Sequence, residues 1–378
     1  MRVRSYVFGL VAVGYAAFLG VIAANLVIDP EAVFGTGFFG VSNNNNERNL
    51  QWAEFAAAPR TFDGLVLGSS RARVIPVEEL SQRMAGVTFA RFSVSFGRIT
   101  DFLSMLEFVL RKKAETGTRL RAVFLLLDVD ELGRASADQN AIQWMPPPAL
   151  SGRSAFGFWW TNLTAIQPKA WKFALRQNRG GLPAAEAIAP AAGAEDAGKP
   201  LAAAADVAPP DEAGVTVADR APAGEAQAPT YSLKPFISEE PFLPEADRQL
   251  HRVTAERDYP RQLKMVERLV ALCRENNVQL VVATPPLSHA RAAELDLRDF
   301  AKSLDDVSRI VPIWDFSISD WLPDSPDFWD DTVHFRAQLG HMMLMRIFGD
   351  QLPPRWQNFG MPRSPDAALA GAGTAAAR

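Results

Sequence analysis

The N-terminal segment constrains this chain more than any other feature, because no charged residue occurs between Arg4 and Asp29. About 20 apolar residues cross about 30 Å of hydrocarbon as an α-helix, and residues 6–28 are long and apolar enough to do so. We therefore expect an uncleaved membrane anchor at 1–29, with the lipid bilayer as the partner of residues 6–28. A signal peptide cleaved near 21–23 and a buried helix of a soluble protein are the alternatives.

The charges that flank this segment predict its orientation. Arg2 and Arg4 precede it, Asp29 and Glu31 follow it, and the next basic residue is Arg48. Because basic residues favour the cytoplasmic side, the N-terminus is expected to stay in the cytoplasm while the rest is exported. We expect a single-pass protein of the inner (cytoplasmic) membrane with a periplasmic or otherwise extracytoplasmic C-terminal domain.

Beyond the anchor, short apolar runs alternate with segments whose apolar residues recur at helical spacing. The continuously apolar run 121–128 is typical of a parallel strand covered on both faces. The alternation predicts an α/β fold of three layers (α/β/α) with a mostly parallel central sheet. Chemistry gathers at the carboxyl ends of such strands, where Ser70 and Asp128 fall. The expected strands are 62–68, 87–94, 121–128, 278–284 and 310–314, and the expected helices are 99–110, 262–275, 291–304 and 336–348.

Composition divides the chain into ordered and disordered parts. Residues 180–229 are rich in alanine and proline and contain no aromatic residue, so they supply too little apolar surface to fold. In chain order we expect a membrane anchor at 1–29, a juxtamembrane segment at 30–59, the first half of the domain at 60–179, a disordered insertion at 180–229, the second half of the domain at 230–362 and a disordered tail at 363–378.

One segment, 154–171, concentrates aromatic residues. We expect it to form a cap or insertion that packs on the core. A role in stacking on sugars or in binding a membrane surface is the alternative. The aromatic residues are Phe156, Phe158, Trp159, Trp160 and Trp171.

Charge and cysteine content exclude several classes of function. The net charge of −4 shows no basic excess, so nucleic acid is not an expected partner. The single cysteine, Cys273, excludes an intramolecular disulfide and lies in a helical apolar run, where a buried thiol is expected rather than a nucleophile. Cys/His spacing typical of zinc sites does not occur, and we expect neither a metal nor a cofactor.

Two short motifs contain the residue types of nucleophilic catalysis. Asp331 and His334 are three residues apart, so the carboxylate can fix one imidazole nitrogen and leave the other free as a base. Ser70 follows the first strand, where a serine projects over the strand ends and the start of a helix supplies amide donors. The alternatives for the second motif are a helix cap and a phosphate-binding turn, although no glycine-rich phosphate motif is present.

Together these motifs resemble the SGNH/GDSL hydrolase superfamily, over about residues 60–135 and 255–350. The G-S-S block at 68–70 matches the family's first block with serine in place of aspartate, and D-T-V-H at 331–334 matches its last. The closest likeness is to membrane-anchored, exported SGNH-like proteins that work beside membrane-bound O-acyltransferases in cell-envelope and exopolysaccharide modification. The motifs shared with that group are G-S-S-R, L-x-L-D, V-x-x-x-P-P and W-D-x-x-x-H-F.

The resemblance implies a role for each matching residue. Ser70 would be the nucleophile, His334 the base and Asp331 the residue that orients it, with backbone amides of Ser70 and Gly97 as oxyanion donors. The family's third block supplies an asparagine donor, whereas this chain has Asp128, which cannot donate when ionised. We interpret Asp128 as a structural residue that holds the turn at Ser70 or an arginine.

Three further residues are candidates for substrate binding. Arg71 and Arg73 follow the serine and could bind an anionic group, with ion-paired arginines as the alternative. His289 also follows a strand and could line the cleft, with a surface histidine as the alternative.

The resemblance implies an exported serine esterase or O-acyltransferase acting on an acylated envelope glycan or exopolysaccharide. Its expected partners are a membrane-bound O-acyltransferase and a polysaccharide. The competing hypothesis is a catalytically inactive accessory or scaffold subunit of a polysaccharide-modifying complex, which the missing asparagine favours. Fold alone cannot choose between them, because function depends on the site.

Overall fold

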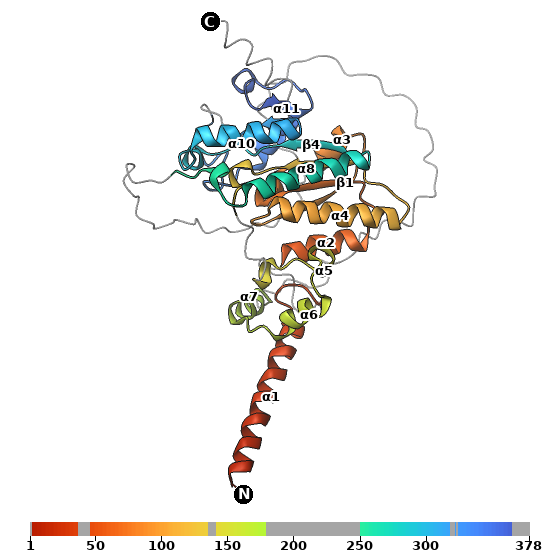
Figure 1. Cartoon of the computed structure of the whole chain (residues 1–378), viewed down its shortest axis with the longest axis vertical. Helices are drawn as coiled ribbons and strands as arrows, with labels where there is room; N and C mark the ends of the chain where they lie inside the picture. Colours follow the sequence, from red (N-terminus) through yellow and green to blue (C-terminus); the bar gives the residue numbers. More distant parts are fainter. Residues whose placement is uncertain are drawn as a thin grey trace, which may run out of the picture. The chain divides into compact units, whose positions relative to one another are not determined.

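The computed structural model describes residues 2–36, 46–134, 141–178, 250–317, 322 and 324–364. The insertion expected at 180–229 lies outside these residues, as does nearly all of the tail expected at 363–378. Within the described part, six strands form one sheet in the order β2-β1-β3-β4-β5-β6 (Figure 1). They are β1 (Gly64–Ser69), β2 (Phe89–Val94), β3 (Ala122–Leu126), β4 (Gln279–Ala283), β5 (Ile313–Asp315) and β6 (Met361–Arg363).

The first five strands are parallel, and β6 pairs antiparallel with β5. The prediction of a mixed α/β fold with a mostly parallel sheet is therefore confirmed. Every residue of β1 and β3 is buried, which explains why their sequences are continuously apolar rather than alternating. The parallel order brings the carboxyl ends of β1, β2 and β3 to one edge of the sheet, where Ser69 of β1 pairs with Val94 of β2.

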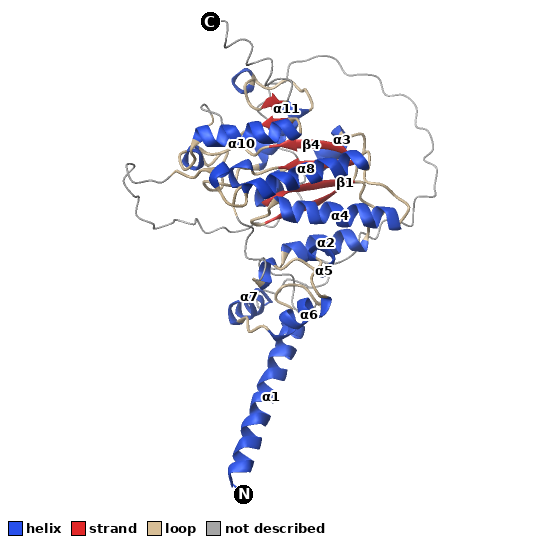
Figure 2. Cartoon of the chain, in the orientation of Figure 1, coloured by secondary structure: helices blue, strands red, loops and turns tan. Residues whose placement is uncertain are grey.

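Alternate strand residues pack into two separate hydrophobic clusters, one for each face of the sheet. Leu65 and Leu125 pack with α4 (Ile99–Glu115), α8 (Tyr259–Glu275) and α10 (Leu297–Ile310). On the other face, Val66, Phe124 and Leu126 pack with α3 (Val77–Arg83) and α11 (Ala337–Ile347). Figure 2 shows these helices around the strands.

Several bounds differ from those the sequence pattern predicts. The helix expected at 291–304 is wrong in its bounds: α9 (His289–Ala292) is a separate short helix, and α10 begins only at Leu297. The cause is Asp296, whose carboxylate accepts the amide N–H groups of Arg298 and Asp299, both at 3.1 Å, and so caps α10.

The structure also extends two segments of the expected organisation. A helix, α2 (Glu47–Ala57), occupies the second part of the juxtamembrane segment 30–59. Strand β6 ends at Arg363, whose guanidinium donates to Asp315 of β5 at 2.7 Å. The ordered domain therefore includes the residue at which the tail was expected to begin.

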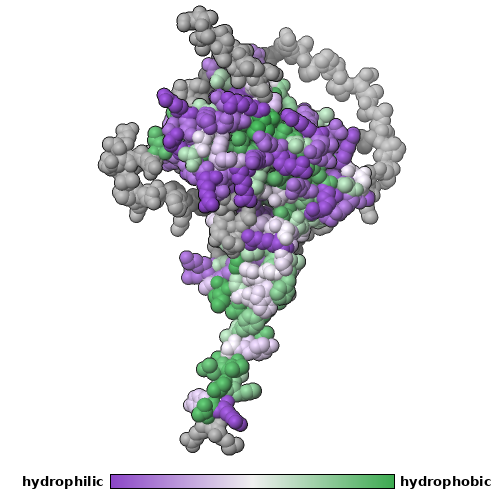
Figure 3. Space-filling model, viewed as in Figure 1, coloured by the Kyte–Doolittle hydropathy of each residue, from purple (hydrophilic) through white to green (hydrophobic). Residues whose placement is uncertain are grey.

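At the N-terminus lies α1 (Arg2–Ile28). Among the described helices it alone is long and apolar enough to cross a membrane, over Val3–Ile28. None of the tested window is buried, in contrast to the core helix of a soluble protein. Figure 3 shows apolar residues along α1 and a mainly hydrophilic surface over the sheet domain. Two helices from the aromatic segment, α6 (Ala155–Thr164) and α7 (Pro168–Asn178), pack against α1.

Candidate active site

Two adjacent serines in the turn after β1 have different roles. Ser69 ends the strand, and its Oγ accepts the N–H of Arg71 at 3.2 Å, so Ser69 is the cap of the 3₁₀ helix η1 (Ser70–Val74). Ser70 is left to project from the turn. Gly68 makes this tight turn possible, since a Cβ there would lie 2.5 Å from the Cβ of Ala72.

The loop carrying the D-T-V-H motif is narrow and anchored at both ends. Trp329 and Phe335 form an antiparallel bridge, and both side chains are buried in the core. Within the loop, the N–H of Asp330 donates to the carbonyl of His334 at 2.9 Å. Anchoring by two buried aromatic rings fixes where the histidine can reach.

Ser70, His334 and Asp331 meet at the carboxyl edge of the sheet. The Oγ of Ser70 lies 2.8 Å from Nε2 of His334, although 264 positions separate them. The other ring nitrogen, Nδ1, lies 2.7 Å from Oδ2 of Asp331. The His334 and Asp331 side chains are 38% and 42% exposed, so the group is open to a substrate. The structure therefore brings together all three residues expected to form a triad.

The electrostatics of Asp331 suit an orienting role. Its Oδ1 accepts the N–H groups of Val333 and His334, both at 2.7 Å. Burial opposes ionisation, but the hydrogen bonds from the His334 ring and from these two amides outweigh it, and the pKa of Asp331 is lowered. An ionised Asp331 holds the proton of His334 on Nδ1, which leaves Nε2 free to accept the Ser70 hydroxyl.

The segment after β4 braces this loop from the side. Ser288 donates its hydroxyl to the carbonyl of Thr332 at 2.5 Å. The next residue, His289, begins α9 and is 53% exposed, with Nδ1 3.6 Å from Asp324. His289 thus lies beside the loop that carries Asp331 and His334, with its ring turned to the carboxylate of Asp324 as in a surface histidine.

Arg71 is buried and fully engaged. It forms a bidentate pair with Asp130, with both N–O distances 2.9 Å, and Arg291 donates to the same carboxylate at 3.0 Å. Burial opposes the charge, but the surrounding carboxylates raise the pKa of Arg71. The ion-paired alternative therefore describes Arg71, and no free guanidinium remains there to hold a substrate.

Asp128 belongs to the same buried network. Its Oδ1 lies 3.2 Å from the Arg71 guanidinium, and Ser69 hydrogen-bonds to the carboxylate. Burial raises the pKa of Asp128, while Arg71 opposes this shift. The structural interpretation of Asp128 agrees with these contacts, because it holds both an arginine and the turn at Ser70.

The remaining candidates are also already engaged. Arg73, 38% exposed, donates to Glu47 at 2.5 Å and to the Ser95 hydroxyl at 2.8 Å. The N–H of Gly97 donates to the carbonyl of Val94 at 2.9 Å, so in this conformation it does not point freely at an oxyanion.

Phe96 is a feature of this edge that sequence reasoning missed. It follows β2 with φ of 53°, in the left-handed region that bulky residues rarely adopt. Its ring is 58% exposed and lies against Trp144, with centroids 5.3 Å apart. The sequence carries no signal for this, because the neighbouring Gly97 is the residue that pattern reasoning would place at a positive φ.

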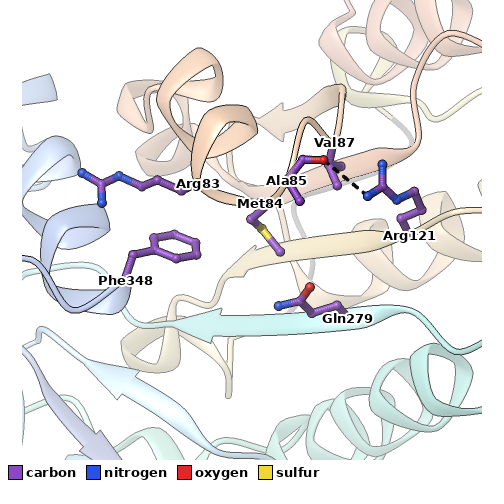
Figure 4. A pocket seen from close by; sticks show the side chains of 7 residues that line it. All are labelled: Arg83, Met84, Ala85, Val87, Arg121, Gln279 and Phe348. Atoms are coloured by element: carbon purple, nitrogen blue, oxygen red, sulfur yellow. Dashed lines mark hydrogen bonds between the residues drawn. The ribbon is translucent and has the colours of Figure 1, made fainter.

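A cavity of about 220 Å³ lies at the opposite edge, near the start of the strands (Figure 4). Its two arginines are paired, Arg83 with Glu79 and Asp350, and Arg121 with Asp63. No nucleophile–base pair lies among its lining residues. These are Arg83, Met84, Ala85, Val87, Arg121, Gln279 and Phe348. Nor do the described residues include a group of three His, Cys, Asp or Glu side chains that could hold a metal ion.

Comparisons with known proteins assign no family to this arrangement: no family model matches the chain, and no curated protein matches its sequence. The function of the site must therefore be inferred from its own geometry.

Proposed function

We propose that this protein is an exported, membrane-anchored serine esterase or O-acyltransferase of the SGNH/GDSL type, with a three-layer α/β/α domain. The observation that carries the proposal is the continuous contact from Ser70 through His334 to Asp331, at 2.8 and 2.7 Å. In the described structure each member has the partner its role requires. A serine, a base within hydrogen-bond reach and a third group that orients the base form the general arrangement of an activated nucleophile.

The chemistry follows from which atoms face each other. Ser70 Oγ attacks the carbonyl carbon of an acyl ester while His334 Nε2 takes the hydroxyl proton. Collapse of the tetrahedral intermediate breaks the bond to the leaving alcohol, which receives that proton from His334. The resulting acyl-Ser70 is attacked by water in hydrolysis, or by another hydroxyl in acyl transfer, with His334 again moving the proton. Asp331 stabilises the imidazolium formed at each step.

The substrate class follows from the position proposed for the domain. With α1 crossing the inner membrane and Arg2 and Arg4 in the cytoplasm, the site faces the periplasm or cell exterior. Among the acyl esters on that side of the membrane, the SGNH resemblance favours those of envelope glycans or an exopolysaccharide. A membrane-bound O-acyltransferase is the proposed partner, because it would supply or exchange acyl groups at the same membrane.

A fluorophosphonate probe tests the proposal, because it reacts covalently only with an activated serine. The full-length protein should be labelled at Ser70, and both Ser70→Ala and His334→Ala should abolish labelling. Ser69→Ala is the matched control, since Ser69 caps η1 and only positions the turn; it should keep measurable labelling. Folded protein that shows no labelling, or equal labelling of Ser70→Ala, would exclude the enzyme.

An inactive accessory or scaffold subunit is the second candidate, and the oxyanion side of the site favours it. Asp128 stands at the place of the family's asparagine donor, and the Gly97 amide already donates to Val94. Asp128 is held by Arg71 and does not supply the amide donor of an asparagine, and loss of one oxyanion donor costs about 10²–10³-fold in rate. Absence of labelling together with binding to an acylated glycan or to a membrane-bound acyltransferase would identify the scaffold.

A further inference from the structure

Helix α6 exposes its aromatic side chains instead of burying them. Phe156, Trp159 and Trp160 are 73%, 42% and 47% exposed, while Phe158 alone of this group is buried. The helix contains no charged residue. The expectation that the aromatic segment packs on the core is therefore wrong in its partner: Phe158 packs with Val33 and Met145 apart from the two core clusters, the helices lie against α1, and the three other rings of α6 stay on the surface. An exposed apolar surface of this kind marks a contact with another molecule or a membrane.

The position of α6 along α1 indicates that the exposed rings contact a membrane. The Trp160 ring lies beside that of Phe18, with centroids 6.1 Å apart. Any stretch of about 20 residues within Val3–Ile28 includes Phe18. At 1.5 Å per residue, Phe18 then lies about 6 Å or more inside the hydrocarbon boundary, whichever stretch spans. A ring packed on Phe18 must share that depth.

Hydrogen bonding around α6 suits a medium without water. Asn25 of α1 is fully buried and donates to the carbonyls of Leu163 and Ala165 at 2.8 and 2.9 Å. These carbonyls end α6 and have no helical partner of their own. The Asn25 oxygen in turn accepts the indole N–H of Trp171 at 2.8 Å. A polar side chain inside a spanning helix is costly unless it is paired in this way.

The polar side chains of α6 itself follow the same pattern. Thr161, Asn162 and Thr164 each donate to the carbonyl four residues earlier, at 2.8, 2.9 and 2.8 Å. Such bonds to the preceding turn let a helix carry polar residues without exposing their donors to an apolar surrounding.

The neighbouring helix α7 presents charges suited to lipid headgroups. Lys169, Lys172 and Arg176 are exposed and stand at spacings of three and four residues, which places them on one face of the helix. No acidic residue occurs in α7. Basic residues at a membrane surface attract anionic headgroups, and aromatic residues prefer the boundary between headgroups and acyl chains.

We infer that α6 and α7 form a second membrane contact, with the α6 rings inserted among the acyl chains beside Phe18 and the basic face of α7 on anionic phospholipid. This inference rests on the proposal that α1 spans the bilayer, and it goes beyond it. A single spanning helix leaves a domain free to swivel, whereas two contacts fix its orientation. The site would then face the membrane-proximal space at a set angle.

Spin labels on the full-length protein in phosphatidylcholine–phosphatidylglycerol vesicles test the inference. Cysteines are introduced singly as Phe156→Cys or Trp160→Cys in a Cys273→Ala background. Leu10→Cys, in the N-terminal half of α1, reports the span, and Leu297→Cys, 48% exposed on the sheet domain, reports water. Oxygen concentrates in lipid and a nickel chelate stays in water, so the ratio of their relaxation effects measures depth.

We expect the oxygen-to-nickel ratio at 156 and 160 to exceed that at 297 several-fold, as a lipid-exposed position requires. A lipid-like ratio at 10 with water-like ratios at 156 and 160 overturns the second contact and leaves the span intact. A water-like ratio at 10 overturns the span and this inference with it. Shielding of 156 and 160 from both reagents would show that protein, not lipid, covers α6, and would also overturn it.

Discussion

Asp331 holds His334 twice: Oδ2 lies 2.7 Å from the ring nitrogen Nδ1, and Oδ1 accepts the backbone N–H of the same histidine at 2.7 Å. One carboxylate therefore fixes both the tautomer of the ring and the loop that carries it. Because the two oxygens make separate contacts, a substitution at Asp331 can change the tautomer of the ring and leave the hydrogen bond to the loop in place.

Asp331→Asn is expected to slow fluorophosphonate labelling of Ser70 by about 10³–10⁴-fold, because an amide N–H₂ facing Nδ1 favours the tautomer with the proton on Nε2. The asparagine oxygen can still accept the loop amides, so the fold should change little. Labelling rates measured beside urea unfolding test this. A slow rate explained by a large loss of stability would contradict an orienting role.

Because the pKa of Asp331 is lowered in the folded protein, the contribution of this residue to the free energy of unfolding depends on pH. A carboxyl whose folded pKa lies below its unfolded value, about 3.9, stabilises the protein above that value. The contribution is lost as the pH falls through the folded pKa. Because the side chain is 42% exposed, the difference in unfolding free energy between wild type and Asp331→Asn should be about 1 kcal/mol or less at pH 7 and should shrink as the pH falls below about 4.

Asp130→Asn should lower the free energy of unfolding strongly. Asp130 is 1% exposed and neutralises both Arg71 and Arg291. Breaking a buried pair by removing one partner leaves uncompensated charge and costs about 3–5 kcal/mol. Glu275→Gln, which breaks an exposed pair with Arg268, is the control and should cost less than about 1 kcal/mol. Equal losses in urea unfolding at pH 7 would contradict the assignment.

Acid should reproduce the Asp130 effect in the wild-type protein. Burial opposes ionisation of Asp130, but Arg71 and Arg291 outweigh it and hold its pKa well below the usual range. Its stabilisation is therefore complete above about pH 4 and declines as the pH falls further. The unfolding free energy of Asp130→Asn should accordingly depend less on pH below 4 than that of wild type.

The convergence of Ser70 and His334 was predictable from sequence for a physical reason. Ser70 directly follows β1 and His334 lies in the connection from β5 to α11, and the carboxyl ends of parallel strands share one edge of the sheet whatever the length of chain between them. The continuously apolar run 121–128 identified β3, because strands buried on both faces are mainly apolar.

The roles of the charged residues were not predictable in the same way. Whether Arg71 binds substrate or a carboxylate depends on Arg291 and Asp130, which are 161 positions apart. No local pattern encodes that meeting. Likewise, Asn25 reads as an isolated polar residue in an apolar segment, and only its contacts with Leu163 and Trp171 explain it. Pairings between distant polar side chains require the coordinates.

Cys273 should be inert in the folded protein. It is 1% exposed, and burial raises the pKa of its thiol to about 12, so almost no thiolate forms at pH 8. A maleimide reagent should modify it only after unfolding, in step with the loss of secondary structure in urea. Rapid modification of native protein at pH 8 would show that the packing of α8 is looser than described.

Phe96 offers a test of whether backbone strain at the edge of the sheet serves the site. A left-handed conformation costs a non-glycine residue about 1–2 kcal/mol, and the exposed ring recovers part of this by packing on Trp144. Phe96→Gly and Phe96→Ala both remove the ring, but only glycine removes the strain. Glycine has more freedom in the unfolded chain, which offsets about 0.4–1 kcal/mol of that relief. The glycine variant should therefore be the more stable of the two, with a free energy of unfolding up to about 1.6 kcal/mol above that of the alanine variant.

The two variants should nevertheless behave alike toward substrate. Phe96 lies two residues beyond Val94, which pairs with Ser69 next to the proposed nucleophile Ser70, and we expect its exposed ring to line the approach to Ser70. Both substitutions should slow labelling by a bulky aromatic sulfonyl fluoride by about tenfold, and labelling by a small fluorophosphonate should change less than about twofold. Since only the missing ring is common to both variants, matched losses would assign the effect to ring contact. Losses that follow stability instead, larger for alanine than for glycine, would assign Phe96 to the fold and not to the substrate.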